Sequence, residues 1–274
     1  MYATYFNLRE APFSILPDPR FLYFSRCHAM ALSMLEYGVL NQAGFTVVTG
    51  EIGSGKTTLV RHLLNNIGNG PRVGLINQTL HAGDNLLEWL FVAFDRPNPG
   101  GSQAAMYKAF RDFILESATR GERVVLIVDE AQNLRPAHME ELRTLSNVNE
   151  DAMMFQLILV GQPELGKKLS APTMRQFAQR ISSDFHLHRL ASSEVEAYLE
   201  HRLTVAGGSL QLIDPAARRL IAKASTCVPR KINILADRCF AYAYGMERKR
   251  VTLSVVQKVL SDRSRHGVSR LVAA

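Results

Sequence analysis

Cysteine is scarce in this sequence, and no long hydrophobic run occurs. Cys27, Cys227 and Cys239 are scattered along 274 residues. Because their number is odd and no metal-ligand spacing joins them, they favour reduced thiols over a disulfide framework or a zinc site. No apolar run approaches the roughly 20 residues that cross a bilayer. The opening MYATYFNLREAPF lacks a basic segment followed by a long apolar one, so we expect no secretory signal and a cytoplasmic location.

Charge is unevenly divided along the chain. Residues 1–190 carry 18 Lys and Arg and 18 Asp and Glu, whereas residues 191–274 carry 14 and 7, so the whole net charge of +7 lies in the last third. This asymmetry indicates a domain boundary and is compatible with an acidic partner. An ordinary solvated basic helical face explains it equally well.

Apolar runs alternate with helical stretches through the first two thirds of the chain. Most of the runs are continuous rather than alternating, which is typical of strands buried on both faces of a parallel sheet. Expected strands are 45–50, 72–77, 123–130, 155–161 and 185–190, and expected helices are 57–67, 84–94, 103–120 and 136–148. The pattern predicts a doubly wound α/β domain over 1–190.

After residue 190 the strand signals stop. The stretches 192–206, 214–226, 230–244 and 252–263 are amphipathic, and Asp214-Pro215 is a typical helix start. We predict a helical domain over 191–264 and a flexible tail over 265–274.

The stretch GEIGSGKTTL follows the first expected strand and matches the P-loop pattern from Gly50 to Thr57 in full. Its glycines allow backbone angles that turn several N–H groups inward, and the following helix adds the positive end of its dipole. The loop predicts a cradle for the phosphates of ATP, formed by the consecutive residues Gly50, Glu51, Ile52, Gly53, Ser54, Gly55, Lys56, Thr57 and Thr58. Lys56 would reach the β- and γ-phosphates, Thr57 would ligate Mg²⁺, and Thr58 would touch the α-phosphate.

Two carboxylates end the buried run VVLIVDE. Asp129 is predicted to hold Mg²⁺ through water, and Glu130 to polarise the attacking water. A simple acidic pair capping the next helix is the alternative. Gln162 follows another buried strand, which lies between the two Walker strands in a sheet ordered 5-1-4-3-2, so it is predicted to contact the γ-phosphate or the water. Its alternative is an amide that hydrogen-bonds the loop QPEL.

Arginines are candidates for stabilising the charge that develops on the γ-phosphate. Arg180 is the first choice for a finger that reaches a neighbouring subunit's nucleotide, Arg175 is the second, and Arg189 is also available. Arg230 in CVPRKIN is predicted to approach the phosphates within the same subunit. Ordinary surface arginines or a structural salt bridge are the alternatives for these positions.

Together these motifs resemble the ExeA/GspA-type AAA+ ATPases over roughly residues 1–245. The aromatic start with APF and PDP comes first, followed in the family's order by GEIGSGKTTL, VVLIVDEAQNL, EELRTLSNVNE, LILVGQPEL, RQFAQRI, YLEHRL and VPRKIN. The resemblance implies an ATPase with a P-loop α/β domain, a helical lid and nucleotide at subunit interfaces of a homo-oligomeric ring or filament. It places Lys56, Thr57, Asp129, Glu130, Gln162, Arg180 and Arg230 in the Walker, sensor and finger roles.

The sequence departs from that family in three respects. Val228 stands where glycine usually precedes Pro-Arg, and Asn7 replaces the glycine expected in YFGL. The secretion members continue into a transmembrane helix and a peptidoglycan-binding domain, and we expect neither here. Attachment to a secretion pore is therefore left open.

Two functions fit these observations. The first is a motor or switch that uses ATP and Mg²⁺ to assemble a secretion, pilus or exopolysaccharide system with an envelope protein as partner. The second is a DNA-binding regulator of transposition, which the basic last third favours. Against the second, residues 72–122 carry 5 basic and 6 acidic charges and offer no basic hairpin. A scaffold that does not hydrolyse ATP is disfavoured by Glu130.

Overall fold

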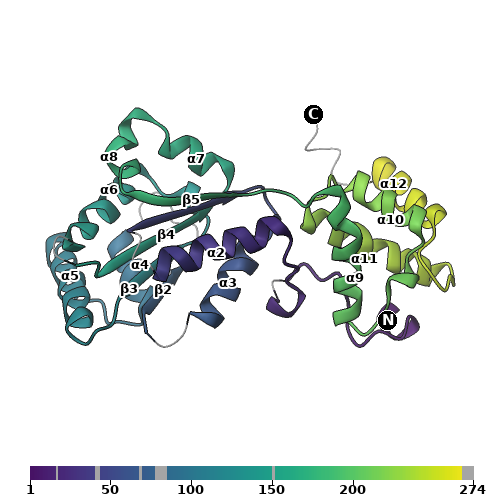
Figure 1. Ribbon diagram of the computed structural model, residues 1–274, viewed down its shortest axis with the longest axis horizontal. Coiled ribbons are helices and arrows are strands. Elements are labelled where there is room, and N and C mark those ends of the chain that lie inside the picture. Colours follow the sequence, from purple (N-terminus) through teal and green to yellow (C-terminus); the bar gives the residue numbers. More distant parts are fainter. Residues whose placement is uncertain (17, 41–43, 68–69, 78–84, 150–151, 267–274) are drawn as a thin grey trace. The chain divides into compact units, whose positions relative to one another are not determined.

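The computed structural model describes residues 1–16, 18–40, 44–67, 70–77, 85–149 and 152–266 (Figure 1). Its contacts divide the chain into two compact units. The helical unit contains residues 1–27, 52–58 and 188–274, and the sheet unit contains residues 28–51 and 59–187. The domain limits expected at residues 190 and 264 stay predictions, and most of the expected tail lies outside the described residues.

The sheet unit is built on five parallel strands in the order β2-β3-β4-β1-β5, which confirms the predicted fold class and strand order. Every residue of β3 and β4 is buried, as expected for central strands covered on both faces. The strands are β1 (Phe45–Gly50), β2 (Arg72–Ile76), β3 (Val124–Val128), β4 (Phe155–Gly161) and β5 (Ile181–Leu187).

The fifth strand was misplaced by the sequence reading. The expected span was 185–190, but β5 covers Ile181–Leu187 and pairs only with β1. As an edge strand it leaves Ser182 and Asp184 exposed, so it lacks the continuous apolar run that marked the other four. The third strand also ends earlier than expected. β3 stops at Val128, so Asp129 and Glu130 lie beyond the paired residues of the sheet.

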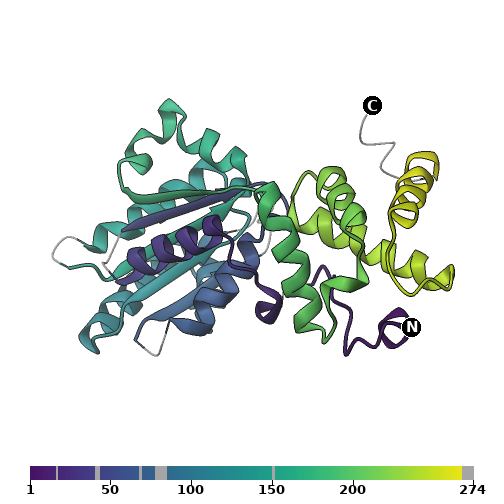
Figure 2. The same cartoon turned by 45° about the vertical axis from the view of Figure 1, so that its right-hand side comes forward.

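Helices cover both faces of the sheet. Phe45, Val47, Leu126 and Leu157 alternate along their strands and pack in one core with α4 to α8. On the opposite face, α2 and α3 lie side by side (Figures 1 and 2). The helices of this layer system are α2 (Arg26–Leu40), α3 (Lys56–Asn66), α4 (Leu86–Ala93), α5 (Gln103–Thr119), α6 (Pro136–Leu145), α7 (Pro163–Leu169) and α8 (Arg175–Ala178), with the short 3₁₀ turns η2 (Ala131–Asn133), η3 (Ser146–Asn149) and η4 (Pro172–Met174).

The helical unit joins the chain's N-terminal segment to its C-terminal helices. Phe6 and Phe13 contact Phe240 with ring centroids 5.0 and 5.7 Å apart. Arg202 is buried and donates from Nε to the carbonyl of Pro12 at 2.6 Å. The elements are α1 (Tyr2–Tyr5), η1 (Pro19–Phe21), η5 (Ser192–Glu194), α9 (Val195–Val205), η6 (Leu210–Leu212), α10 (Pro215–Ala224), α11 (Pro229–Gly245) and α12 (Leu253–His266).

The N-terminal aromatic residues pack onto the C-terminal helices, where Phe6, Phe13 and Phe21 are buried in one cluster. Phe24, further along the same segment, is 44% exposed. Across the described residues, no helix combines the length and the apolar character needed to cross a bilayer.

Candidate functional site

The phosphate loop connects β1 to α3. β1 ends at Gly50 and α3 begins at Lys56. Gly53 and Gly55 have φ angles of +81° and +106°, which side chains with a Cβ rarely adopt. Ser54 and Lys56 are buried. The loop thus has the left-handed turns at its glycines and the helix start at its lysine that a phosphate cradle requires.

Gly53 is needed for a second reason, which is its contact with Arg230 in the same unit. The backbone N–H of Arg230 donates to the carbonyl of Gly53 at 3.1 Å. A Cβ built on Gly53 would lie 2.3 Å from the Cβ of Arg230. The first turn of α11 is therefore seated directly on the phosphate loop, and any residue other than glycine would push it away. The approach of the Arg230 side chain to the phosphates stays a prediction, and the structure places the Arg230 backbone at the loop.

Asn7 and Val228, which stand where the related family has glycine, both have local explanations. Asn7 has a φ of +55°, and asparagine is among the residues that best tolerate this region. Before α11, Thr226 and Cys227 have φ angles of +52° and +60°, whereas Val228 lies in the extended region with φ −84°. The unusual backbone thus falls on the two residues before Val228, and Val228 itself needs no glycine.

Asp129 and Glu130 follow β3 at the carboxyl end of the sheet. Asp129 is 6% exposed, and its Oδ1 accepts the backbone N–H of Glu130 at 2.9 Å. Glu130 has φ +53° and ψ +36°, a left-handed conformation that costs a glutamate about 1–3 kcal/mol. Such strain persists where surrounding contacts impose it, and it concentrates at functional sites.

Two side-chain amides hydrogen-bond the carboxylate of Glu130. Gln132 donates from Nε2 to Oε2 of Glu130 at 2.6 Å, and Gln162 donates from Nε2 to the same oxygen at 3.1 Å. Among the described residues no group donates to Oε1, so that oxygen is the one available to a water molecule. Gln162 is the N-cap residue of α7 and follows β4, the strand between β3 and β1. Thus the structure brings the two predicted residues Glu130 and Gln162 together.

Gln132 was not among the site residues predicted from the sequence. Its Oε1 accepts the backbone N–H of Gln162 at 3.0 Å while its amide nitrogen holds Glu130. The sequence offered one signal for Gln132, its position two residues after Glu130 in VDEAQNL. A sharp turn there brings its side chain within reach of the Glu130 carboxylate.

Lys168 was missed as well. Its Nζ donates to the carbonyls of Gln132 and Leu134, and burial lowers the pKa of this lysine. It secures the turn that follows Glu130.

The predicted arginine finger, Arg180, is bonded within its own chain. Its Nη1 donates to the carbonyl of Arg143 at 3.0 Å and to Oγ of Ser146, and Nη2 donates to Oδ1 of Asn147 at 2.6 Å. These acceptors end α6 and open η3, in the stretch ELRTLSNVN. A role in a neighbouring subunit would require Arg180 to exchange these bonds for phosphate, and that role stays a prediction.

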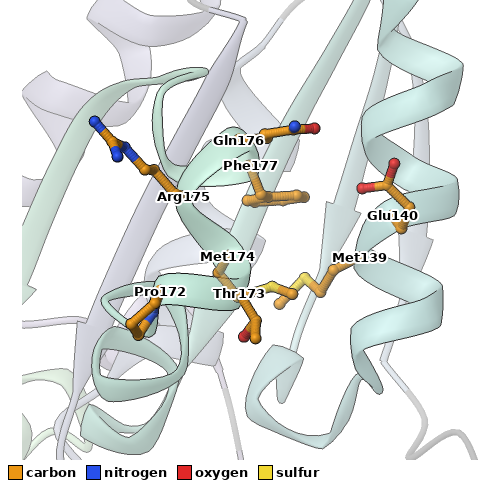
Figure 3. A pocket seen from close by; sticks show the side chains of 8 residues that line it. All are labelled: Met139, Glu140, Pro172, Thr173, Met174, Arg175, Gln176 and Phe177. Carbon is orange, nitrogen blue, oxygen red and sulfur yellow. The ribbon is translucent and has the colours of Figure 1, made fainter.

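Arg175, the second choice, is exposed at the start of α8. It borders a cavity of about 280 Å³ between α6 and the η4–α8 segment. Figure 3 shows Met139 and Phe177 pointing into this cavity, whereas the guanidinium of Arg175 points away from it. Arg189 is also exposed. Because no described residue bonds its side chain, Arg175 would contact another molecule without breaking bonds within the described part of the chain.

Comparison with known proteins places these features in a family. Residues 39–169 match the model of an AAA domain. General secretion pathway protein A of Aeromonas hydrophila is 38% identical over 248 residues, which cover 89% of this chain and 45% of that protein. The chain thus spans about half the length of this curated relative.

Similar solved structures agree on the fold. The Aeropyrum pernix ORC2 protein in ADPNP–ADP complexes has a TM-score of 0.68 and 20% identity, covering 92% of this chain and 71% of its own. The Thermotoga maritima RuvB Holliday junction branch migration motor has a TM-score of 0.55 and 19% identity, covering 87% and 69%. Drosophila ORC bound to DNA has a TM-score of 0.66 and 17% identity, covering 92% and 64%. The chain belongs to the AAA ATPases and, among them, to the family of general secretion pathway protein A.

Proposed function

We propose that this chain hydrolyses ATP with Mg²⁺ and that the energy drives assembly of a secretion, pilus or exopolysaccharide system of the cell envelope. The observation that supports hydrolysis is the way in which the carboxylate of Glu130 is hydrogen-bonded. Two amides bond one carboxylate oxygen, and no donor among the described residues bonds the other, an arrangement that suits a general base facing a water molecule. A protein that only bound nucleotide would have no use for a strained, doubly restrained glutamate at this position.

The donor set fits a magnesium ion. Mg²⁺ prefers one or two carboxylates together with phosphate oxygens and water, and the ligands predicted from the sequence, the carboxylate of Asp129 and the hydroxyl of Thr57, are oxygen donors of that kind. Asp129 is buried, so its charge requires a cation or hydrogen-bond donors nearby. When bound, the metal would neutralise charge on the β- and γ-phosphates, while Lys56 would bind the same phosphates.

A direct test of hydrolysis compares Glu130→Gln with Glu200→Gln. Glu200 is an exposed glutamate on α9 and serves as the matched control. We expect Glu130→Gln to bind ATP normally and to turn over at least about 100-fold more slowly, a typical loss when a general base is removed. Phosphate release and calorimetric ATP binding measure the two quantities. Normal turnover in Glu130→Gln would refute hydrolysis by this site.

The envelope role rests on the relative, because that protein is named for the general secretion pathway. We propose that this chain works as a homo-oligomer with nucleotide at its interfaces, since exposed Arg175 could then reach a second copy. In cells, deletion of the gene should impair export or surface assembly, and a Lys56→Ala copy should fail to restore it. Full restoration by that copy would show that nucleotide use is not needed for the process.

A second candidate is an ATP-dependent DNA-binding regulator of transposition. The basic last third favours it, and two similar structures, Drosophila ORC and Aeropyrum pernix ORC1, were solved with DNA. Lysines and arginines that contact phosphates make affinity fall steeply with salt. Binding to duplex DNA should therefore be measured with ATP at two salt concentrations. ATP-dependent, salt-sensitive binding would favour this candidate, and absence of binding near physiological salt would favour the envelope role.

A further inference from the structure

We propose that Gln132 is a positioning residue that orients the Glu130 carboxylate, an inference that rests on the proposed hydrolysis. Gln132 lies in η2, the short turn directly after Glu130. It is half-buried, so its amide is neither fully solvated nor part of the apolar core.

Both ends of the Gln132 amide are used. Nε2 donates to Oε2 of Glu130 at 2.6 Å, and Oε1 accepts the backbone N–H of Gln162 at 3.0 Å. Rotating the amide by 180° would place an oxygen against a carboxylate and an NH₂ group against an N–H. The two bonds therefore fix the orientation of the amide.

The chain makes room for this side chain at Gly161. A Cβ on Gly161 would lie 2.8 Å from Oε1 of Gln132, too close for any ordinary contact. The φ of Gly161 is not positive, so glycine is needed here for space and not for backbone conformation. The last residue of β4 thus gives Gln132 the position from which it reaches Gln162.

A separate contact fixes the backbone of Gln132. Lys168, in the last turn of α7, donates to the carbonyl of Gln132 and, at 2.7 Å, to that of Leu134. The N-cap of the same helix is Gln162. Helix α7 therefore contacts Gln132 twice. Lys168 in its last turn bonds the main-chain carbonyl of Gln132, and the N-cap residue Gln162 bonds the side-chain amide.

This arrangement restricts which oxygen of Glu130 can act as base. With Oε2 engaged by both Gln132 and Gln162, a proton from water is accepted at Oε1. Without Gln132, Glu130 keeps a single, longer hydrogen bond at 3.1 Å, and its carboxylate can rotate away from the water. Binding of ATP does not require that orientation, so the loss should fall on the chemical step.

The test measures kcat and KM for ATP in Gln132→Ala. Removing a hydrogen bond to a charged group should lower kcat by about 10- to 100-fold, while KM should change by less than about 2-fold if binding is untouched. Gln103→Ala is the matched control, because Gln103 also donates its amide to a glutamate, Glu141, at 2.8 Å. That control should leave both constants unchanged.

A double mutant separates positioning from general damage. In a Glu130→Gln background, Gln132→Ala should change turnover by less than about 2-fold, because the group it orients is already lost. An equal loss in both backgrounds, or an unchanged kcat in the single variant, would overturn the proposal. If Gln132→Ala does not fold, Gln132→Met gives the same comparison, since it keeps a neutral side chain of similar length and loses the donor to Glu130.

The outcomes also distinguish this inference from the function on which it rests. Normal turnover in Glu130→Gln alone would refute the hydrolytic site itself. Slow turnover in Glu130→Gln together with normal kcat in both Gln132 variants would refute only the positioning role.

Discussion

Replacing Gly53 with alanine should weaken nucleotide binding through two separate physical effects. The first is backbone strain, because a residue with a Cβ at φ +81° costs about 1–2 kcal/mol. The second is a clash, because the new Cβ would lie 2.3 Å from the Cβ of Arg230. Carbon atoms in contact normally stay about 3.5–4.0 Å apart, so Arg230 must retreat by more than about 1 Å.

That retreat would break the hydrogen bond from Arg230 to the carbonyl of Gly53, which contributes about 0.5–1.5 kcal/mol. Together the two effects amount to about 2 kcal/mol, or roughly a 30-fold weaker affinity at about 1.4 kcal/mol per factor of ten. Calorimetric titration with ADP and with ATP measures this loss.

Two further variants separate the effects. Combining Gly53→Ala with Arg230→Gly removes the clash but keeps the strain, so Gly53→Ala should cost less nucleotide affinity in the Arg230→Gly background than in the parent protein. Gly166→Ala is the control, because a Cβ at Gly166 in α7 meets nothing within 4 Å. That change should stabilise the protein by about 0.5–1 kcal/mol. If Gly53→Ala binds ADP within about 2-fold of the parent, the loop does not hold phosphate in the conformation described.

Three other expectations can be checked directly. Lys56→Ala should abolish ATP binding in calorimetry, whereas Lys167→Ala, an exposed lysine on α7, should bind normally; binding retained in the first variant would remove Lys56 from the phosphate site. Mixing Arg180→Ala with Lys56→Ala should restore part of the ATPase activity if Arg180 acts on a neighbouring subunit, and no rescue at any ratio would leave it a structural residue. Burial raises the pKa of Cys239 to about 12, so at pH 8 it should react with a thiol reagent only after unfolding; rapid modification of the folded protein at Cys239 would contradict its burial in the helical core.

Much of the sheet could be predicted because its central strands are buried on both faces. The runs over 45–50 and 155–161 coincide with β1 and β4 to the residue. β5 could not be placed in the same way, since an edge strand with Ser182 and Asp184 exposed lacks that run. Its position depends on pairing with β1, and pairing partners are not encoded in local composition.

The phosphate loop and the acidic strand end were also predictable, because their chemistry requires particular residue types at fixed spacing. The packing around them was not. Nothing in the sequence around Gly53 indicates that its missing side chain leaves space for Arg230, which is 177 positions further along the chain. The sequence likewise does not indicate that Phe6 and Phe13, near the start of the chain, pack beside Phe240.

The contacts around Glu130 explain why α7 matters although it was not among the expected helices. Its N-cap Gln162 and its last-turn Lys168 both hold Gln132, and Gln132 and Gln162 both hold Glu130. A shift of this helix would therefore move both donors to the carboxylate together. Because Gln162 is also the residue predicted to contact the γ-phosphate, a phosphate that drew its amide away would leave Gln132 as the remaining restraint on Glu130. Because Gln162 caps α7 and Gln132 is bonded by both Gln162 and Lys168, we expect the orientation of the proposed base to depend on what the end of β4 contacts, which would couple nucleotide state to catalysis.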